Sequence, residues 1–512
     1  MSSKKLYFKV VARINDITDR ICGESDSIFD LCRILSWVNV IKWIWIYQQF
    51  ITNITNRTDD ILHYLPNHSN DKEMLERMGL KTIDDLFSDI PEGLRINDLS
   101  IPPGASELEV LREAEELMNI SKGGGDMPMF LGGGYYDHFI PTIVDNVLSR
   151  SELYTSYTPY QPEMSQGILQ ALFEYQSLMS DILQMDAVNT SMYDHHTAIG
   201  EAILMANRIT HKPRFLIPEY LTQDKLCVID NYVRGSKITV ETIPFMPEKG
   251  IMDLESLAEM IDDDVSGVYI ETPNMAGMYD PGVLKIKEML NPKQIFVVGT
   301  NPMAMSITKP PGEYGADIVV GDAQPMGIPL SYGGPSTGIF ATTMKHVRKM
   351  PGRIIGASKD TEGRRAFCMT LSTREQHIRR ERATSNICTN QALTSIAAAA
   401  YMASLGKTGF RKLGIQLASR ARYLSERINE LEGFTAPAFP GHFFNEFPVR
   451  IDGDVCALLN AAEERGVLAG INVSAEVGSL KNIFTVSTTE MHTHEDYEKL
   501  LTALLDSMEV IS

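Results

Sequence analysis

The sequence has few cysteines, and none of them is placed for a thiolate site. No two of the six stand at CxxC spacing, which excludes the common zinc and redox motifs and favours reduced, buried thiols in a cytoplasmic protein. No N-terminal segment has the layout of a secretory signal. The adjacent His195 and His196 are poor metal ligands as a pair, because neighbouring side chains diverge, so no metal site is expected.

Basic residues are outnumbered, and long apolar runs are missing. The chain has 47 lysines and arginines against 66 aspartates and glutamates, a formal charge of -19, which argues against a nucleic-acid or anionic-membrane surface. The apolar segment 34–51 holds all three tryptophans, is interrupted by Asn39 and Lys42, and is shorter than the roughly 20 residues that cross a bilayer. We expect no stable membrane association. An interfacial helix is the alternative to an extension without a role in the fold.

At 512 residues the chain can bury a large core and is expected to form two or more domains. The first 60 residues differ in character from the rest, and the last third changes its pattern again. We therefore expect an atypical extension over 1–60, a helical segment over 61–120, a large domain over 121–345 and a smaller α/β domain over 346–512.

Strands and helices alternate through the middle of the sequence, which predicts a doubly wound, mostly parallel sheet. Ligands of such sheets bind beyond the carboxyl ends of the strands. Strands are expected at 215–218, 237–242, 265–271, 294–298, 318–320 and 338–341, and helices at 71–87, 106–118, 168–182, 198–209, 222–233, 253–263 and 283–290. Towards the C-terminus we expect helices at 387–402, 408–432, 453–465 and 494–508, and strands at 446–451 and 483–488.

The stretch Gly132-Gly-Gly-Tyr-Tyr-Asp-His138 is the densest cluster of polar and aromatic residues. Its glycines let backbone approach a ligand closely, and its tyrosines and histidine supply stacking surface and proton-transfer groups. The alternative is a tight loop held by packed tyrosines. The loop at 154–163, with three tyrosines and two prolines, is a second candidate, for which an ordered surface loop is the alternative.

Residues 372–386 concentrate arginines in an acidic protein. Arginines and hydroxyls before an expected helix suit a phosphate or a carboxylate, although a solvated charge run or a subunit contact has the same composition. The run 194–197 fits a helix N-cap, and the N-terminus of that helix is suited to an anion.

Four strings together resemble glycine dehydrogenase (decarboxylating), the P-protein family of the glycine cleavage system. They are Tyr135-Tyr-Asp-His, Tyr157-Thr-Pro-Tyr-Gln-Pro-Glu, Thr373-Arg-Glu-Gln-His-Ile-Arg-Arg and Ala383-Thr-Ser-Asn-Ile-Cys-Thr. The resemblance runs from about residue 63 to the C-terminus. It is specific to the alpha-type, N-terminal-half subunit of the two-chain form.

The resemblance implies an α/β, aminotransferase-like large domain (pyridoxal phosphate fold type I) and a smaller C-terminal α/β domain. It implies an oxidoreductase that decarboxylates glycine with pyridoxal phosphate (PLP) and passes the aminomethyl group to the lipoyl arm of the H-protein. It also implies that a beta-type partner subunit holds PLP covalently, in a cytoplasmic α2β2 heterotetramer with active sites at the subunit interface.

The division of labour follows from two positions that lack the groups PLP needs. By similarity, Gln324 stands where the partner subunit has the Schiff-base lysine, and an amide cannot form an imine. The acidic residue expected to pair with the pyridinium nitrogen is replaced by Val298-Gly299-Thr300. The chain alone is therefore not expected to run PLP chemistry.

The resemblance also gives the candidate site residues. Tyr135, Tyr136 and His138 are expected to line the catalytic wall on the glycine and lipoyl side. Hydrogen bonds to the partner's cofactor phosphate are expected from Thr384, Ser385 or Asn386, with Arg382 adding charge for the phosphate or the glycine carboxylate. We assign the 157–163 loop to interface and pocket shape.

Two rival functions remain open at this point. One is a self-sufficient PLP enzyme that uses another lysine, for which Lys309 is the nearest candidate, although it precedes the strand at 318–320. The other is a structural or regulatory pseudoenzyme that only stabilises its partner. The surviving Tyr/His and Thr/Ser/Asn clusters argue against a pure scaffold.

Overall fold

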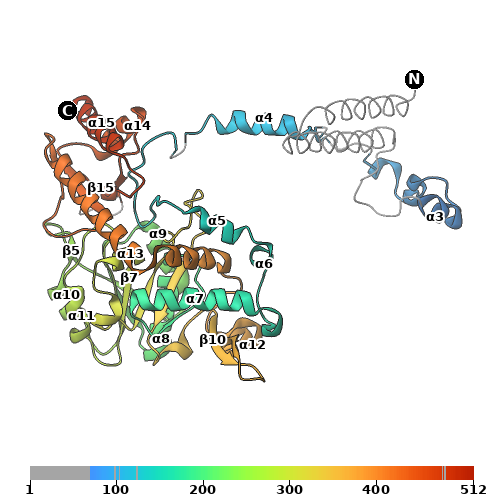
Figure 1. Cartoon of the computed structure of the whole chain (residues 1–512), viewed down its shortest axis with the longest axis horizontal. Helices are drawn as coiled ribbons and strands as arrows, with labels where there is room; N and C mark the ends of the chain where they lie inside the picture. The colour runs from blue at the N-terminus through green and yellow to red at the C-terminus, as the bar shows by residue number, and fades with distance from the viewer. Residues whose placement is uncertain are drawn as a thin grey trace, which may run out of the picture. The chain divides into compact units, whose positions relative to one another are not determined.

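The structure, a computed structural model, describes residues 70–96, 100–102, 104–122, 125–475, 477 and 480–511 (Figure 1). The expectations for residues 1–60, including the tryptophan-rich segment, lie outside the described residues. The chain divides into two units, Met1–Ser106 and Glu107–Ser512. Within the described residues, no helix is long and apolar enough to cross a membrane.

The N-terminal helices present no buried side chain. Helix α3 spans Asp71–Met78 and ends at Gly79, whose φ of 73° closes the helix in the left-handed conformation that glycine adopts readily. The prediction of one helix over 71–87 is therefore wrong, because a separate 3-10 helix, Ile83–Phe87, starts after the capping residue Thr82. Helix α4, Glu107–Met118, agrees with its prediction.

A seven-stranded sheet in the order β1-β9-β8-β7-β6-β2-β3 forms the large domain. Strands β3, β2, β6, β7 and β8 are parallel, and β9 and β1 join antiparallel at one edge. The predicted α/β, mostly parallel sheet is confirmed. The strands are β1 Ala187–Val188, β2 Arg214–Pro218, β3 Thr239–Ile243, β6 Val265–Glu271, β7 Ile295–Thr300, β8 Ile318–Asp322 and β9 Gly338–Thr342.

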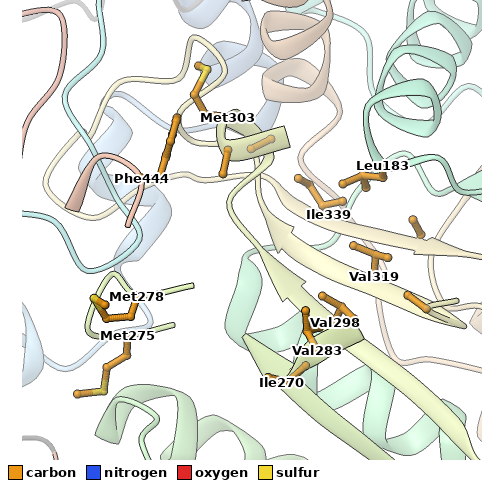
Figure 2. Packing of buried hydrophobic residues seen from close by; sticks show 14 of the residues in the cluster. Leu183, Ile270, Met275, Met278, Val283, Val298, Met303, Val319, Ile339 and Phe444 are labelled. Carbon is orange, nitrogen blue, oxygen red and sulfur yellow. The ribbon is translucent and has the colours of Figure 1, made fainter. Parts of the chain in front are cut away.

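Helices cover both faces of this sheet, because alternate strand residues enter different cores. In β7, Phe296 and Val298 join one buried cluster, and Ile295 and Val297 join another. Figure 2 shows Val298 in the first cluster, beside Ile270, Val319 and Ile339 of other strands. That cluster includes residues of α7 (Gln166–Leu183) and α11 (Val283–Met289), and the second includes α8 (His195–Thr210) and α9 (Gln223–Val233).

Shorter elements complete this part of the chain. They are α5 Thr142–Leu148, α6 Ser151–Tyr154, α10 Leu254–Met260 and α12 Gln376–Arg379, with the two-stranded pairs β4 Phe245–Met246 with β5 Ile251–Met252, and β10 Ile354–Lys359 with β11 Arg365–Thr370.

The span α13 (Ala392–Asn429) contains two helices joined across a kink, which agrees with the two predicted at 387–402 and 408–432. Its two halves meet at Gly406, whose φ of 58° and ψ of 177° are not helical. The first half starts later than predicted, because Asn390 and the Gln391 N–H are hydrogen-bonded to Thr190 and Ser191 instead. These bonds draw the preceding segment onto the sheet edge.

The C-terminal part is a small α/β domain. Its antiparallel sheet has the order β12-β13-β15-β14, with β12 Phe434–Thr435, β13 Glu446–Ile451, β14 Ile471–Asn472 and β15 Ile483–Ser487, and its helices are α14 Val455–Glu464 and α15 His494–Ile511. Its buried cluster runs from Ala421 of α13 onward and takes in Phe130. The earlier residues 397–402 of α13 belong to the large core. The predicted boundary at residue 346 stays a prediction.

Candidate functional site

A small cavity lies at the carboxyl ends of β6, β7 and β8, where ligands of doubly wound sheets bind. Its volume is about 70 Å³, and it lies against the loop of Gly133 and Gly134. Its charged and polar lining comes from α8, α9, three strand ends and the small domain. The principal side chains are Tyr136, His195, Lys225, Glu271, Asn301 and Glu446.

A buried ion pair takes up one side of the cavity. The Lys225 ammonium in the first turn of α9 lies 2.6 Å from Oε1 of Glu271 at the end of β6. The Tyr269 hydroxyl donates to the same oxygen over 2.7 Å. Burial raises the pKa of Glu271, but the Lys225 charge, the neighbouring His195 and the hydrogen bonds from Lys225 and Tyr269 together outweigh it and hold the pKa below its usual value. Glu271 is therefore an ionised carboxylate whose Oε1 is bonded to Lys225 and Tyr269.

The next ring in this network is His195, the first residue of α8. Its Nε2 lies 3.1 Å from the Tyr269 hydroxyl. Burial, together with the neighbouring Lys225 charge, lowers the pKa of His195 to about 3. The imidazole is therefore neutral at physiological pH, and it extends the hydrogen-bonded network without adding charge.

The strand position where an acid was expected has no room for one. A Cβ added at Gly299 would lie 2.3 Å from the Tyr269 hydroxyl and 3.0 Å from Nε2 of His195. The neighbouring Val298 is buried in the large core. The space in front of the strand is thus occupied by this chain's own tyrosine and histidine, which explains why no carboxylate stands there.

Gln324 lies just beyond β8 and is buried, in the position that the sequence suggested for a missing lysine. Its amide oxygen accepts the Tyr136 N–H over 2.8 Å, and its amide nitrogen donates to the carbonyls of Tyr136 and Ile328 over 2.9 Å each. The amide is therefore a structural clamp on the 132–138 loop.

The 132–138 loop is fastened to the cavity from within. The Tyr136 hydroxyl donates to Glu446 over 2.7 Å, and the Gly133 N–H donates to the same carboxylate over 3.0 Å. A Cβ at Gly132 would lie 2.5 Å from Glu446, so this close approach requires glycine. Burial raises the pKa values of Tyr136 and Glu446, which keeps the tyrosine protonated as a donor.

The three predicted catalytic residues separate into different surroundings. Tyr135 is half-buried, and its hydroxyl lies 3.5 Å from Oδ2 of Asp322. Tyr136 is buried at the cavity, whereas the buried His138 turns away and its Nδ1 lies 2.9 Å from Glu490. The structure therefore brings Tyr136 to the cavity and Tyr135 next to the lining residue Asp322, and it ties His138 to the small domain.

The expected helix N-cap at 194–197 is confirmed. The Thr197 N–H donates to the Asp194 carboxylate over 2.7 Å at the start of α8. The anion that meets this N-terminus comes from the chain itself, because the His195 N–H donates to Asp322 over 3.3 Å. Burial raises the pKa of Asp322 to about 6.

The second predicted cluster lies on the irregular segment before α13. The Ser385 hydroxyl donates to Glu201 of α8 over 2.6 Å, and the Thr384 N–H donates to the Arg374 carbonyl. Arg382 and Asn386 are exposed. Of this cluster, Ser385 is therefore used inside the chain, and Arg382 and Asn386 face outward.

The 157–163 loop joins this second cluster. The Tyr157 hydroxyl lies 2.8 Å from that of Thr389, and the Tyr160 and His377 rings meet with centroids 5.3 Å apart. Tyr157 and Tyr160 thus pack against residues 377–389, the segment that carries Arg382, and we call the loop and this segment the 157/382 surface. This surface and the cavity are the two groups into which the predicted site residues fall.

Sequence reasoning missed Lys225, Glu271 and Glu446. Each is a single charged residue in a different segment, and no motif joins them. A usable signal did exist for Glu271, because it ends the apolar strand Val265–Glu271 with a charge at the carboxyl edge of the sheet.

The ion pair leads to a stability prediction. Lys225→Met is expected to lower the free energy of unfolding by about 3–5 kcal/mol, because it leaves the Glu271 carboxylate buried without its cation. Urea denaturation of the full chain measures this, with Arg234→Met as control, since the Arg234–Asp230 pair is exposed and its loss should change almost nothing. The double variant Lys225→Met/Glu271→Leu should recover much of the loss. A single variant no less stable than the control would contradict the prediction.

The residues of this cavity do not fit PLP. Small-molecule pockets usually measure about 300–1,000 Å³, against about 70 Å³ here. The one lysine in the lining, Lys225, is held by Glu271, and Lys309 is exposed and precedes β8. This cavity therefore offers no free lysine for a PLP imine.

Comparisons with known proteins agree with the resemblance. The family model described as "Glycine cleavage system P-protein" matches residues 62–504. Two relatives are both called "Probable glycine dehydrogenase (decarboxylating) subunit 1". The one from Geobacillus sp. (strain WCH70) is 44% identical over 87% of this chain and 99% of its own. The one from Oceanobacillus iheyensis is 41% identical over 86% and 98%.

Solved structures place the fold in the same group. The crystal structure of an inhibitor-bound glycine decarboxylase (P-protein) superposes with a TM-score of 0.77 at 34% identity, covering 87% of this chain and 100% of that one. The cysteine desulfurase CsdA from Escherichia coli, at 11% identity and a TM-score of 0.54, covers 76% and 98% and shares the fold alone. The chain belongs to the glycine cleavage system P-protein family.

Proposed function

We propose that this chain is the subunit of a two-chain glycine decarboxylase that lacks the Schiff-base lysine. With a PLP-bearing partner of the beta type, it releases the carboxylate of glycine as CO2 and transfers the aminomethyl group to the lipoyl arm of an H-protein. The observation that carries the proposal is the near-complete match to relatives named subunit 1, combined with a cavity of about 70 Å³ whose one lysine is held by Glu271. PLP, when bound by the partner, supplies the electron-accepting ring.

In this proposal the chain contributes a wall to the partner's active site in a cytoplasmic α2β2 assembly. Tyr135 is half-buried and is the tyrosine that we assign to the glycine and lipoyl side. Tyr136 and His138 are buried and bonded to Glu446 and Glu490. We therefore infer that they act on the reaction through the loop, as positioning residues that hold Tyr135 in place.

The 157/382 surface is the part proposed to meet the partner's cofactor phosphate. Asn386 and Arg382 are exposed there, and Thr384 is half-buried beside them. An amide, a hydroxyl and a guanidinium are donors that suit a phosphate. Ser385 has its hydroxyl bonded to Glu201 instead, so we assign it to the support of this segment.

Thr384→Ala is expected to weaken PLP retention in the reconstituted complex about ten- to hundredfold, because a hydrogen bond to a charged group contributes about 1.5–3 kcal/mol. Equilibrium dialysis against PLP, with Thr361→Ala in an exposed turn as control, measures this. Ser385→Ala should lower the melting temperature of the chain more than it lowers PLP retention. PLP affinity equal to wild type in Thr384→Ala would remove this residue from the site.

The proposed function is tested by adding this chain to its PLP-bearing partner and following exchange of the glycine carboxyl group with CO2. Exchange is expected only with both chains present, at matched folded concentrations. A Tyr135→Phe chain should assemble normally and support slower exchange. Exchange at the wild-type rate with Tyr135→Phe would favour the alternative, a purely structural pseudoenzyme. Exchange by the partner alone would refute the proposal.

A further inference from the structure

Three residues that line the cavity described above each have an unpartnered donor. The Thr222 hydroxyl and the amide nitrogens of Asn301 and Asn445 are buried and have no hydrogen-bond partner among the residues that the structure describes. All three residues line the same cavity. Asn445 is only 2% exposed. A buried donor left unpaired costs about 1–3 kcal/mol, so three of them at one cavity indicate a bound molecule that accepts hydrogen bonds.

The orientation of one donor is fixed by its neighbours. The side-chain oxygen of Asn301 accepts the Met303 N–H over 2.9 Å, which leaves the amide nitrogen as the group without a partner. Thr222 precedes the first turn of α9, and its hydroxyl makes no capping hydrogen bond to that helix. A helix N-terminus carries partial positive charge. Hydroxyl, amides and helix terminus together suit a carboxylate.

The remaining charge of the lining has the opposite sign. Lys225 is neutralised by Glu271, which leaves Asp322 and Glu446 as further carboxylates of the same cavity. Asp322, with a pKa of about 6, is largely ionised at neutral pH. A simple anion would meet these acids, and a simple cation would leave the three donors unpaired. A molecule with a carboxylate and an ammonium group satisfies both ends.

The size of the cavity limits the molecule further. Its volume of about 70 Å³ corresponds to about five to seven water-sized groups, at roughly 10–15 Å³ each. Two of its walls are backbone at glycines, and a Cβ added at Gly277 or Gly299 would come within 3.0 Å of other atoms. An α-amino acid without a large side chain fits this space.

We propose that this cavity is a binding site for a small zwitterionic α-amino acid of the size of glycine. The carboxylate lies at Thr222, Asn301 and Asn445, and the ammonium lies at Asp322 and Glu446. Because Glu446 also holds Gly133 and Tyr136, occupancy steadies the loop that carries Tyr135. The site belongs to this chain alone, so it does not rest on the proposed function.

Binding is measured by isothermal titration calorimetry on the full chain without any partner. Glycine is expected to bind saturably with one molecule per chain. Acetate and methylamine, each with one of the two charged groups, are expected to bind at least tenfold more weakly, and valine is expected not to bind. Absence of saturable glycine binding would mean that the donors hold only water. Acetate binding as tight as glycine, or equal binding of valine, would also overturn the proposal.

Two variants assign the binding to the cavity. Asn445→Asp is expected to weaken glycine binding at least tenfold, because it sets a negative charge against the ligand carboxylate. Asn291→Asp makes the same chemical change at an exposed residue outside the cavity and should bind as wild type. Thermal melting checks that both variants fold. If Asn445→Asp does not fold, the ligand series measured on the wild-type chain still tests the proposal. Unchanged affinity in a folded Asn445→Asp chain would refute the site.

Discussion

Replacing Leu111 and Met118 of α4 by aspartate is expected to abolish association with the PLP-bearing partner and leave the melting temperature of the isolated chain unchanged. Leu108, Leu111 and Met118 repeat at helical spacing, so they share one face, and they are 57%, 53% and 71% exposed. No side chain of α4 is buried. Among the described residues, substitutions there remove no buried side chain, so a loss of association is assigned to an intermolecular surface.

The family match and the charge of α4 indicate which protein covers this face. The family match begins at residue 62, so α4 belongs to the part of the chain that relatives share, and relatives bear the name subunit 1. The helix carries five glutamates and one arginine over 107–118, a net charge of -4. We therefore expect a partner groove that is apolar at its floor and basic at its rim.

The magnitude follows from burial. Fully burying a leucine or methionine side chain contributes about 1.5–3 kcal/mol, so losing two of them, with charges placed in the groove, should weaken association at least a hundredfold. Sedimentation velocity of the mixed chains measures this, with Glu113→Gln/Glu116→Gln on the opposite face as control. Wild-type association of the aspartate variant would contradict the prediction. Loss of self-association in place of partner binding would assign the face to a second copy.

The sheet could be predicted from sequence because its strands are buried on both faces. Such strands are continuous apolar runs, and the predicted strand at 265–271 coincides with β6, Val265–Glu271. The strand order could not be predicted, because neighbours such as β2 and β6 are distant in sequence. The break of α3 at Gly79 was missed for a local reason, since one glycine in the left-handed conformation outweighed a helical pattern.

The site was predictable only as far as a motif reached. The Gly132–His138 string identified a loop, and the structure places that loop on the cavity. Its partners Gln324 and Glu446 come from β8's end and from the small domain, so only the tertiary fold joins them. The sequence also could not show which way each side chain of the second cluster points. Ser385 and Asn386 are adjacent in an irregular segment, yet Ser385 is bonded to Glu201 whereas Asn386 is exposed.

Restoring a lysine at the apparent lysine position is expected to damage the chain without giving it PLP chemistry. Gln324→Lys removes three hydrogen bonds to the backbone of Tyr136 and Ile328. Each contributes about 1 kcal/mol, and the buried ammonium gains no partner in exchange, so we expect a loss of roughly 3–5 kcal/mol in unfolding free energy. Gln170→Lys, at an exposed position of α7, is the matched control and should change almost nothing.

Spectroscopy separates the stability effect from the chemistry. Added PLP should give Gln324→Lys no imine absorbance and no adduct that borohydride can fix, because the Lys225–Glu271 pair, Tyr269 and His195 still occupy the cavity. A stable Gln324→Lys chain that binds PLP covalently would show that the lysine alone was missing. If the expected result is found, the missing lysine is not the sole reason why this chain forms no PLP imine. Gln324→Lys still leaves Gly299 without space for an acidic side chain, because Tyr269 and His195 lie against it.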